Sequence, residues 1–171
     1  MLLAVLVMSA HAEDQQCKVA RKNTVTQALA IVTEIDSHIE AVPPDEANYL
    51  QTEWTAAMKD NNMARYSLVS VRPYYPAWTL HGSLQRAKTD LSSMSGPAFG
   101  ESLERYQVKK AAAVMVRLSF AVNDFMQYTQ ADNGRQQHVL SQEQQGHYSQ
   151  QLGSLALMLS TYIDCTVDDI K

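Results

Sequence analysis

Apolar residues recur at alternating steps of three and four positions along most of the chain, and this spacing places them on one face of an α-helix. The pattern predicts a first helix over about residues 18–42. The helix is followed by Pro43 and Pro44, which cannot continue it. Its predicted apolar stripe consists of Val25, Ala28, Val32, Ile35 and Ile39.

A second helix is predicted to open at Asp45 and Glu46, where acidic side chains suit the positive end of the helix dipole. Three more predicted helices cover about residues 76–94, 98–131 and 141–166. Residues 63–71 fit either a short helix or an extended piece. The predicted core positions after the first helix are Leu50, Trp54, Ala57, Met58, Leu80, Leu84, Ala87, Leu91, Met94, Leu103, Tyr106, Val114, Leu118, Val122, Phe125, Tyr128, Tyr148, Leu152, Leu155, Leu159 and Tyr162.

Length and composition agree with an all-helical fold. The chain has 171 residues, 46% of them apolar, with only six Gly and five Pro, which is too few for a turn-dense β protein. We therefore predict an all-α, antiparallel bundle of four to six helices, with residues 13–171 forming a single domain. The formal net charge of −4 shows no cationic footprint, which argues against nucleic acid as a partner.

The first twelve residues resemble a secretory signal. The short apolar run LLAVLVMSA ends in Ala10-His11-Ala12, a small-residue cleavage pattern. No basic residue precedes the run, so the alternative interpretation is the first turns of a buried helix. The run is too short to span a bilayer, so we expect no stable membrane anchor. The expected location is periplasmic or secreted, and the absence of Asn-x-Ser/Thr acceptors gives slight support to a bacterial source.

The two cysteines lie near opposite ends of the chain. Cys17 follows the proposed cleavage point and Cys165 lies close to the C-terminus. An even pair in an exported protein favours one disulfide, and the chain-entropy model gives about 4 to 5 kcal/mol for closing so long a loop. Basic residues follow Cys17 and acidic residues surround Cys165, which is compatible with the pairing. Two buried free thiols are the alternative.

No motif for catalysis or for a cofactor is present. Glu34 with His38, and Glu143 with His147, are each spaced by four, whereas the di-iron bundle motif spaces Glu and His by three. Two lone cysteines are too few ligands for zinc, and no haem-attachment, phosphate-binding or nucleophile motif occurs. We therefore predict no cofactor and no metal, and the sequence gives no positive support for an enzyme.

The strongest candidate for a functional surface is the Pro-rich and aromatic segment at residues 71–78, together with the start of the helix that follows it. Arginine and aromatic side chains are enriched at binding hot spots because they bury a large area and keep a polar group. Alternatively, Trp78 and one tyrosine fold back and seal the end of the bundle. The predicted binding residues are Arg72, Tyr74, Tyr75, Trp78 and His81.

These observations favour a small exported protein that binds another protein without catalysis, of the inhibitor, immunity or accessory type. Two alternatives stay open. One is a small secreted enzyme whose site forms only in the fold. The other is a carrier that holds an apolar ligand between helices lined by methionine and aromatic side chains.

Peptide mapping under non-reducing conditions tests the predicted leader and disulfide together. Protein recovered from its native compartment should begin near Glu13 and contain one peptide pair linked through Cys17 and Cys165. Two unlinked thiols, or a retained apolar leader, would contradict this prediction.

Overall fold

The computed structural model is helical throughout the residues that it describes, which are 23–94, 101–130 and 140–168. Residues 101–109, 161 and 164–168 are described by their backbone alone. The first helix is described over residues 23–38 and is called the N-terminal helix below. The others are α2 (Pro44–Lys59), α3 (Met63–Ser70), α4 (Tyr75–Met94), α5 (Glu101–Gln130) and α6 (Gln142–Asp168).

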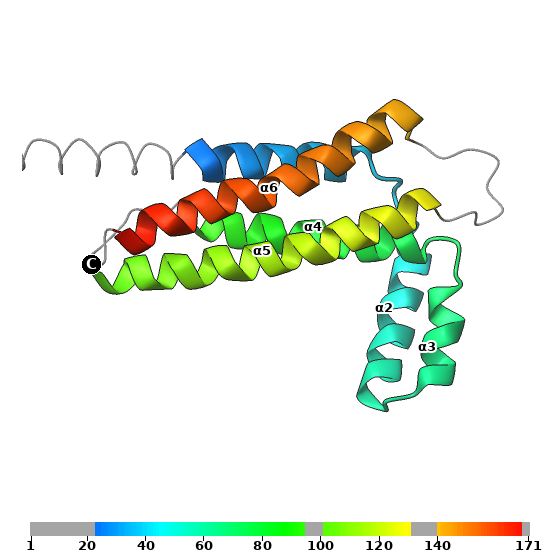
Figure 1. Ribbon diagram of the computed structural model, residues 1–171. Coiled ribbons are helices and arrows are strands. Elements are labelled where there is room, and N and C mark those ends of the chain that lie inside the picture. The colour runs from blue at the N-terminus through cyan, green and yellow to red at the C-terminus, as the bar shows by residue number, and fades with distance from the viewer. Residues whose placement is uncertain (1–22, 95–100, 131–139, 169–171) are drawn as a thin grey trace, which may run out of the picture.

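Four of the helices form a bundle in which successive members run in opposite directions. The N-terminal helix, α4, α5 and α6 lie side by side, and the chain reverses direction at each step (Figure 1). The hairpin of α2 and α3 is inserted between the N-terminal helix and α4 and projects from one end of the bundle. The predicted all-α class is therefore confirmed for the described residues, with a helical hairpin added to the first connection.

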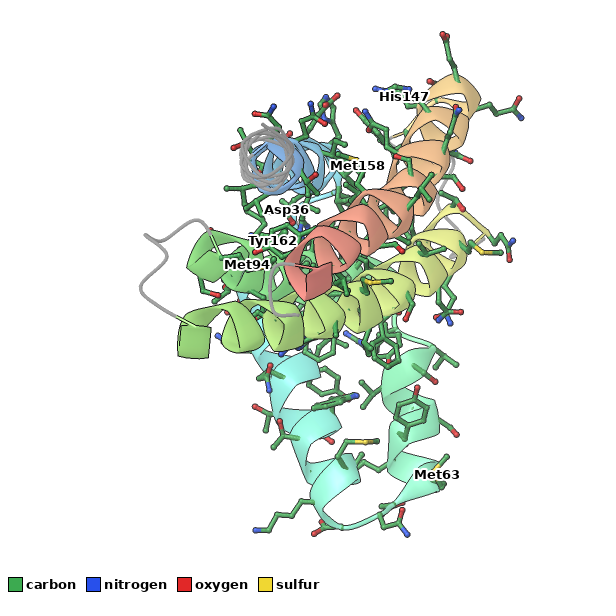
Figure 2. All side chains as sticks on the ribbon, turned by 60° about the vertical axis from the view of Figure 1, so that its left-hand side comes forward. Asp36, Met63, Met94, His147, Met158 and Tyr162 are labelled. Atoms are coloured by element: carbon green, nitrogen blue, oxygen red, sulfur yellow. The ribbon has the colours of Figure 1, made fainter. Side chains whose placement is uncertain are left out.

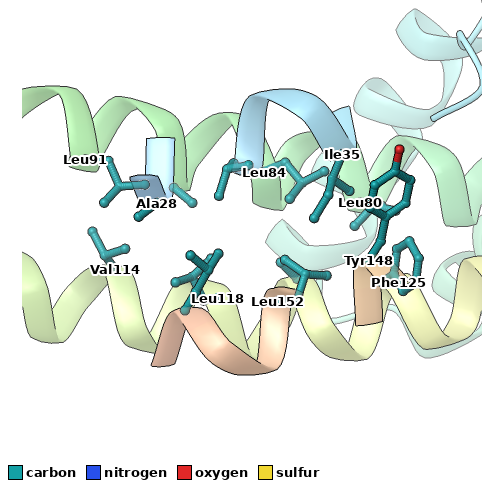
Figure 3. Close-up of a cluster of buried hydrophobic side chains, with 14 of the residues drawn as sticks. Ala28, Ile35, Leu80, Leu84, Leu91, Val114, Leu118, Phe125, Tyr148 and Leu152 are labelled. Atoms are coloured by element: carbon teal, nitrogen blue, oxygen red, sulfur yellow. The ribbon is translucent and has the colours of Figure 1, made fainter. Parts of the chain in front are cut away.

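The predicted apolar stripes form the bundle core. The first four residues of the predicted stripe lie in the N-terminal helix and Ile39 follows it directly. All five are buried, as are the stripe residues of α4. Figure 3 shows Ala28, Leu91 and Val114 facing one another towards one end, and Ile35, Leu80 and Phe125 towards the other. Small residues, including Ala28, Ala87, Ala111 and Ala121, let the helices approach closely. The side chains of Leu103 and Tyr106 lie outside the described part.

The N-terminal helix ends at residue 38, four residues earlier than predicted, and residues 39–43 are not helical. Side chains of other helices bind this connection. The Glu40 amide donates to the Tyr128 hydroxyl of α5 at 3.5 Å, and the Glu40 carbonyl lies 3.0 Å from Nε2 of His81 in α4. Because these side chains satisfy its backbone, the connection can leave the helix before the prolines.

The α2–α3 hairpin resolves the ambiguity of residues 63–71 in favour of a helix. Asn61 adopts a positive φ of 49° in the turn, a conformation that asparagine tolerates well. The side chain of Asn62 then accepts a hydrogen bond from the Arg65 amide and caps α3. Met58, predicted to be a core residue, is exposed instead, because α2 has only α3 and the start of α4 to pack against.

A capping box is present at the start of α6. The Ser141 hydroxyl accepts from the Gln144 amide at 3.2 Å, and the Gln144 side chain accepts from the Ser141 amide at 2.9 Å.

None of the helices in the described part of the chain is both long enough and apolar enough to cross a membrane.

The predicted Cys17–Cys165 disulfide falls outside what the structure describes. Cys17 precedes the described residues, and Cys165 is described by its backbone within α6. The leader at residues 1–12 likewise lies outside the described part. Both stay predictions.

Two leucines of α6 provide a matched test of this core. Leu155 is 0% exposed, whereas Leu157, on the same helix, is 73% exposed. Leu155→Ala should lower the free energy of unfolding by about 2–5 kcal/mol, because it removes buried contacts and leaves a cavity. Leu157→Ala should change it by no more than about 0.5 kcal/mol. Urea unfolding followed by circular dichroism measures both, and equal losses would contradict the described helix orientation.

Candidate functional site

The structure places the predicted binding residues on two sides of the start of α4. Arg72, Tyr74, Tyr75 and Trp78 lie where the hairpin joins the bundle. His81, one turn further along α4, faces the N-terminal helix instead. We call the first group the hairpin base, together with the hairpin side chains that it contacts, which are Glu46, Tyr49, Trp54 and Tyr66.

Arg72 ties the α3–α4 turn to the first turn of α2. Its Nε and Nη2 donate to the two carboxylate oxygens of Glu46 at 2.8 and 2.6 Å, which is a bidentate pair. Its guanidinium also lies 5.0 Å from the centre of the Tyr49 ring, within the range of a cation–π contact. The hydrogen bonds from Arg72 hold the pKa of Glu46 below its ordinary value of 4.5.

A second pair of the same kind joins the middle of the hairpin. Arg65 of α3 donates through Nε and Nη2 to the Glu53 carboxylate of α2 at 2.7 and 2.9 Å. The hydrogen bonds from Arg65 lower the pKa of Glu53. One bidentate pair therefore fixes α3 against α2 and the other fixes the turn that follows α3, and each adds orientation as well as attraction.

The aromatic rings of the hairpin base pack inwards. Tyr75 is 8% exposed, and its ring meets those of Tyr66 and Trp78 with centroid distances of 6.4 and 6.0 Å. The rings of Trp54 in α2 and Trp78 meet edge to face, with their centroids 6.1 Å apart. Burial raises the pKa of the Tyr75 hydroxyl, which donates to the Tyr66 hydroxyl at 3.3 Å.

These contacts match the alternative in which a tyrosine and Trp78 fold back. Leu50, Val69 and Tyr75 form a small core that is separate from that of the bundle. Trp54, Tyr74 and Trp78, all half-buried, pack against it. The aromatic segment thus attaches the hairpin to the bundle, and most of its ring area is used in that packing.

A different set of apolar side chains on the hairpin faces solvent. Leu68 is 67% exposed and Val71 is 74% exposed, and with the exposed Ala64 they follow a step of four and then three. We call Ala64, Leu68 and Val71 the α3 outer face. Met63, 63% exposed, lies at the far end of the hairpin (Figure 2).

The sequence carried one signal for this face. Leu68 and Val69 are adjacent, and neighbouring residues of a helix point about 100° apart, so a short helix cannot bury both against one partner. The structure buries Val69 and exposes Leu68. Without a decision between helix and extended chain for residues 63–71, the signal could not be used.

Polar side chains elsewhere in the described residues make contacts within and between helices. Within the described residues, no three His, Cys, Asp or Glu side chains converge as metal ligands would. His38 directs Nδ1 to the backbone carbonyl of Glu34 at 2.9 Å. The buried Ser83 hydroxyl of α4 donates to the Asp124 carboxylate of α5 at 2.6 Å and so joins the two helices. It also accepts a hydrogen bond from Arg86.

No protein-family model matches this chain, and no curated protein or solved structure is significantly similar to it. The residues of the hairpin and of the bundle therefore carry the functional inference by themselves.

The Arg72–Glu46 pair should make the hairpin base less stable as the pH falls into the acid range. A carboxyl group whose pKa is lowered by folding stabilises the folded state above its unfolded pKa, and this contribution is lost as the pH falls through the folded value. The Glu46 carboxyl should therefore titrate below pH 4.5 in the wild type, since Arg72 favours its charged form. In Arg72→Gln it should return towards 4.5. Carbon-detected NMR titration of Glu46 measures the pKa, and an identical value in the two proteins would contradict the pairing.

Proposed function

We propose that this protein binds another protein without catalysis, and that the α3 outer face makes the contact. The observation that carries the proposal is the exposure of Leu68 and Val71 on a hairpin that projects from the bundle. Single exposed apolar residues are common on protein surfaces. Here, however, they share one helix face, with Met63 at the end of the same hairpin.

The spacing of the α3 outer face supports a particular recognition mode. A partner with an apolar groove accepts helices through side chains at steps of three and four, as Ala64, Leu68 and Val71 are spaced. α3 has only eight residues, and an isolated helix of that length would be marginal in water. In this protein α2 and the hairpin base hold it in helical form before any partner binds.

The two arginine–glutamate pairs favour binding through this preorganisation. Arg65–Glu53 holds α3 against α2, and Arg72–Glu46 holds the turn after α3 against the first turn of α2. A partner would therefore meet a helix that is already ordered, and less conformational entropy would be lost on association. Direct contact of a partner with Arg72, Tyr74, Tyr75 and Trp78 stays a prediction from the sequence.

The proposal includes export to the periplasm or the exterior, as the leader and the two cysteines predict, and it covers inhibitor, immunity and accessory roles alike. The carrier alternative is less well supported, because large aliphatic side chains such as Leu84, Leu118 and Leu152 fill the middle of the bundle. For the enzyme alternative, the described residues contain no group of three His, Cys, Asp or Glu side chains that could hold a metal ion.

Site-specific photocrosslinking tests the proposal. A photoreactive residue at Leu68 should link the protein to one dominant partner in an extracytoplasmic extract of the source cell. The same residue at Phe120, a 59% exposed position on α5, should not. Leu68→Glu should reduce partner recovery at least about tenfold, as loss of an interface anchor does, while leaving the melting temperature nearly unchanged. Equal crosslinking from both positions, or unchanged recovery by Leu68→Glu, would refute the proposed surface.

A further inference from the structure

His81 of α4 has a hydrogen-bond partner at each ring nitrogen. Nδ1 lies 2.8 Å from Oδ1 of Asp36 in the N-terminal helix. Nε2 lies 3.0 Å from the carbonyl oxygen of Glu40 in the connection that follows this helix. The ring therefore bridges the last turn of the N-terminal helix and the non-helical residues beyond it.

Both partners of the ring are acceptors. The Glu40 carbonyl can only accept, and the second oxygen of Asp36 receives hydrogen bonds from the Gln85 amide at 2.7 Å and the Lys88 ammonium at 3.3 Å. Such surroundings suit an ionised carboxylate. A neutral imidazole has a single N–H and can serve only one of the two acceptors. Only the doubly protonated ring satisfies both.

The contact controls the path of the connection to the hairpin. The Glu40 carbonyl binds His81 and the Glu40 amide donates to Tyr128, so side chains of α4 and α5 hold both backbone groups of one residue. Ile39, just before it, is buried in the bundle core. Three residues after Glu40, Pro43 precedes the start of α2. Releasing the Glu40 carbonyl would therefore remove one of the contacts that hold the segment from which the hairpin departs, beside the packing of Ile39 and Val42.

We propose that His81 is a proton-dependent latch that fastens residues 39–43 to α4 when its ring is protonated and loosens them when it is neutral. Charging the ring adds the second hydrogen bond, so the connection is held more firmly when the ring is doubly protonated. The latch depends on contacts within this chain alone and does not require the proposed partner.

Other titratable groups on the elements around the ring are Asp36, Lys88, the Glu40 side chain and Tyr128. Burial raises the pKa of Tyr128. Two other histidines lie near the end of the N-terminal helix: His38 and His147, which flank Tyr148 at centroid distances of 5.6 Å and are exposed.

Hydrogen exchange on the full chain tests the latch, with rates corrected for the intrinsic effect of pH. In the wild type, the protection factor of the Glu40 amide should fall by about tenfold between pH 5.5 and pH 8, the scale expected for losing a hydrogen bond to a charged group. In His81→Gln, protection should be low and equal at both pH values. The matched control His38→Gln should behave as the wild type. A wild-type protection factor that is the same at both pH values, or a fall that persists in His81→Gln, would overturn the latch.

Nitrogen NMR of the wild-type imidazole provides a second measurement that needs no variant. At pH 5.5 both ring nitrogens of His81 should carry protons, and by pH 8 one of them should have lost its proton. A ring that is already neutral at pH 5.5, or one that still carries both protons at pH 8, would overturn the proposal even if His81→Gln fails to fold.

Discussion

Burial of one apolar stripe from each of four long helices is the constraint on which the rest of the structure depends. The stripes meet in a single core, so the direction of each helix and the face that it presents are fixed together. α2 and α3 do not contribute to that core, because the N-terminal helix, α4, α5 and α6 already surround it. The hairpin must therefore bury its own small set of residues against the start of α4, and it does so with Leu50, Val69 and Tyr75.

Polar contacts along α4 add specificity to this apolar core. Asp90 is buried at the α4–α5 interface and binds Lys110 and Arg117, and Ser83 binds Asp124 across the same interface. A shift of α5 along α4 by one turn would leave the Asp90 carboxylate without its cations, and a buried unpaired charge is costly. Asp36 plays the same part between α4 and the N-terminal helix. Aliphatic packing alone tolerates such shifts more readily.

The sequence predicted the long helices well because each carries a stripe of several turns, and a stripe of that length has one consistent periodicity. It could not decide residues 63–71, where nine residues give too few repeats and the capping role of Asn62 becomes evident only once α3 is known. It identified Arg72, Tyr74, Tyr75 and Trp78 as chemically notable without showing which way they face. Aromatic and arginine side chains serve packing and binding equally well, and only their neighbours distinguish the two uses.

Leu68 and Val69 show why exposure and burial on the hairpin have separate causes. Val69 is held by its contacts with the hairpin core, so the fold accounts for its apolar character. Leu68 adds little to the packing of the hairpin, because its side chain is largely exposed. The neighbouring position holds Ser67, an exposed polar residue. A polar residue at position 68 would therefore serve the fold equally well. The proposed contact with a partner would give the apolar side chain of Leu68 a role that the fold itself does not.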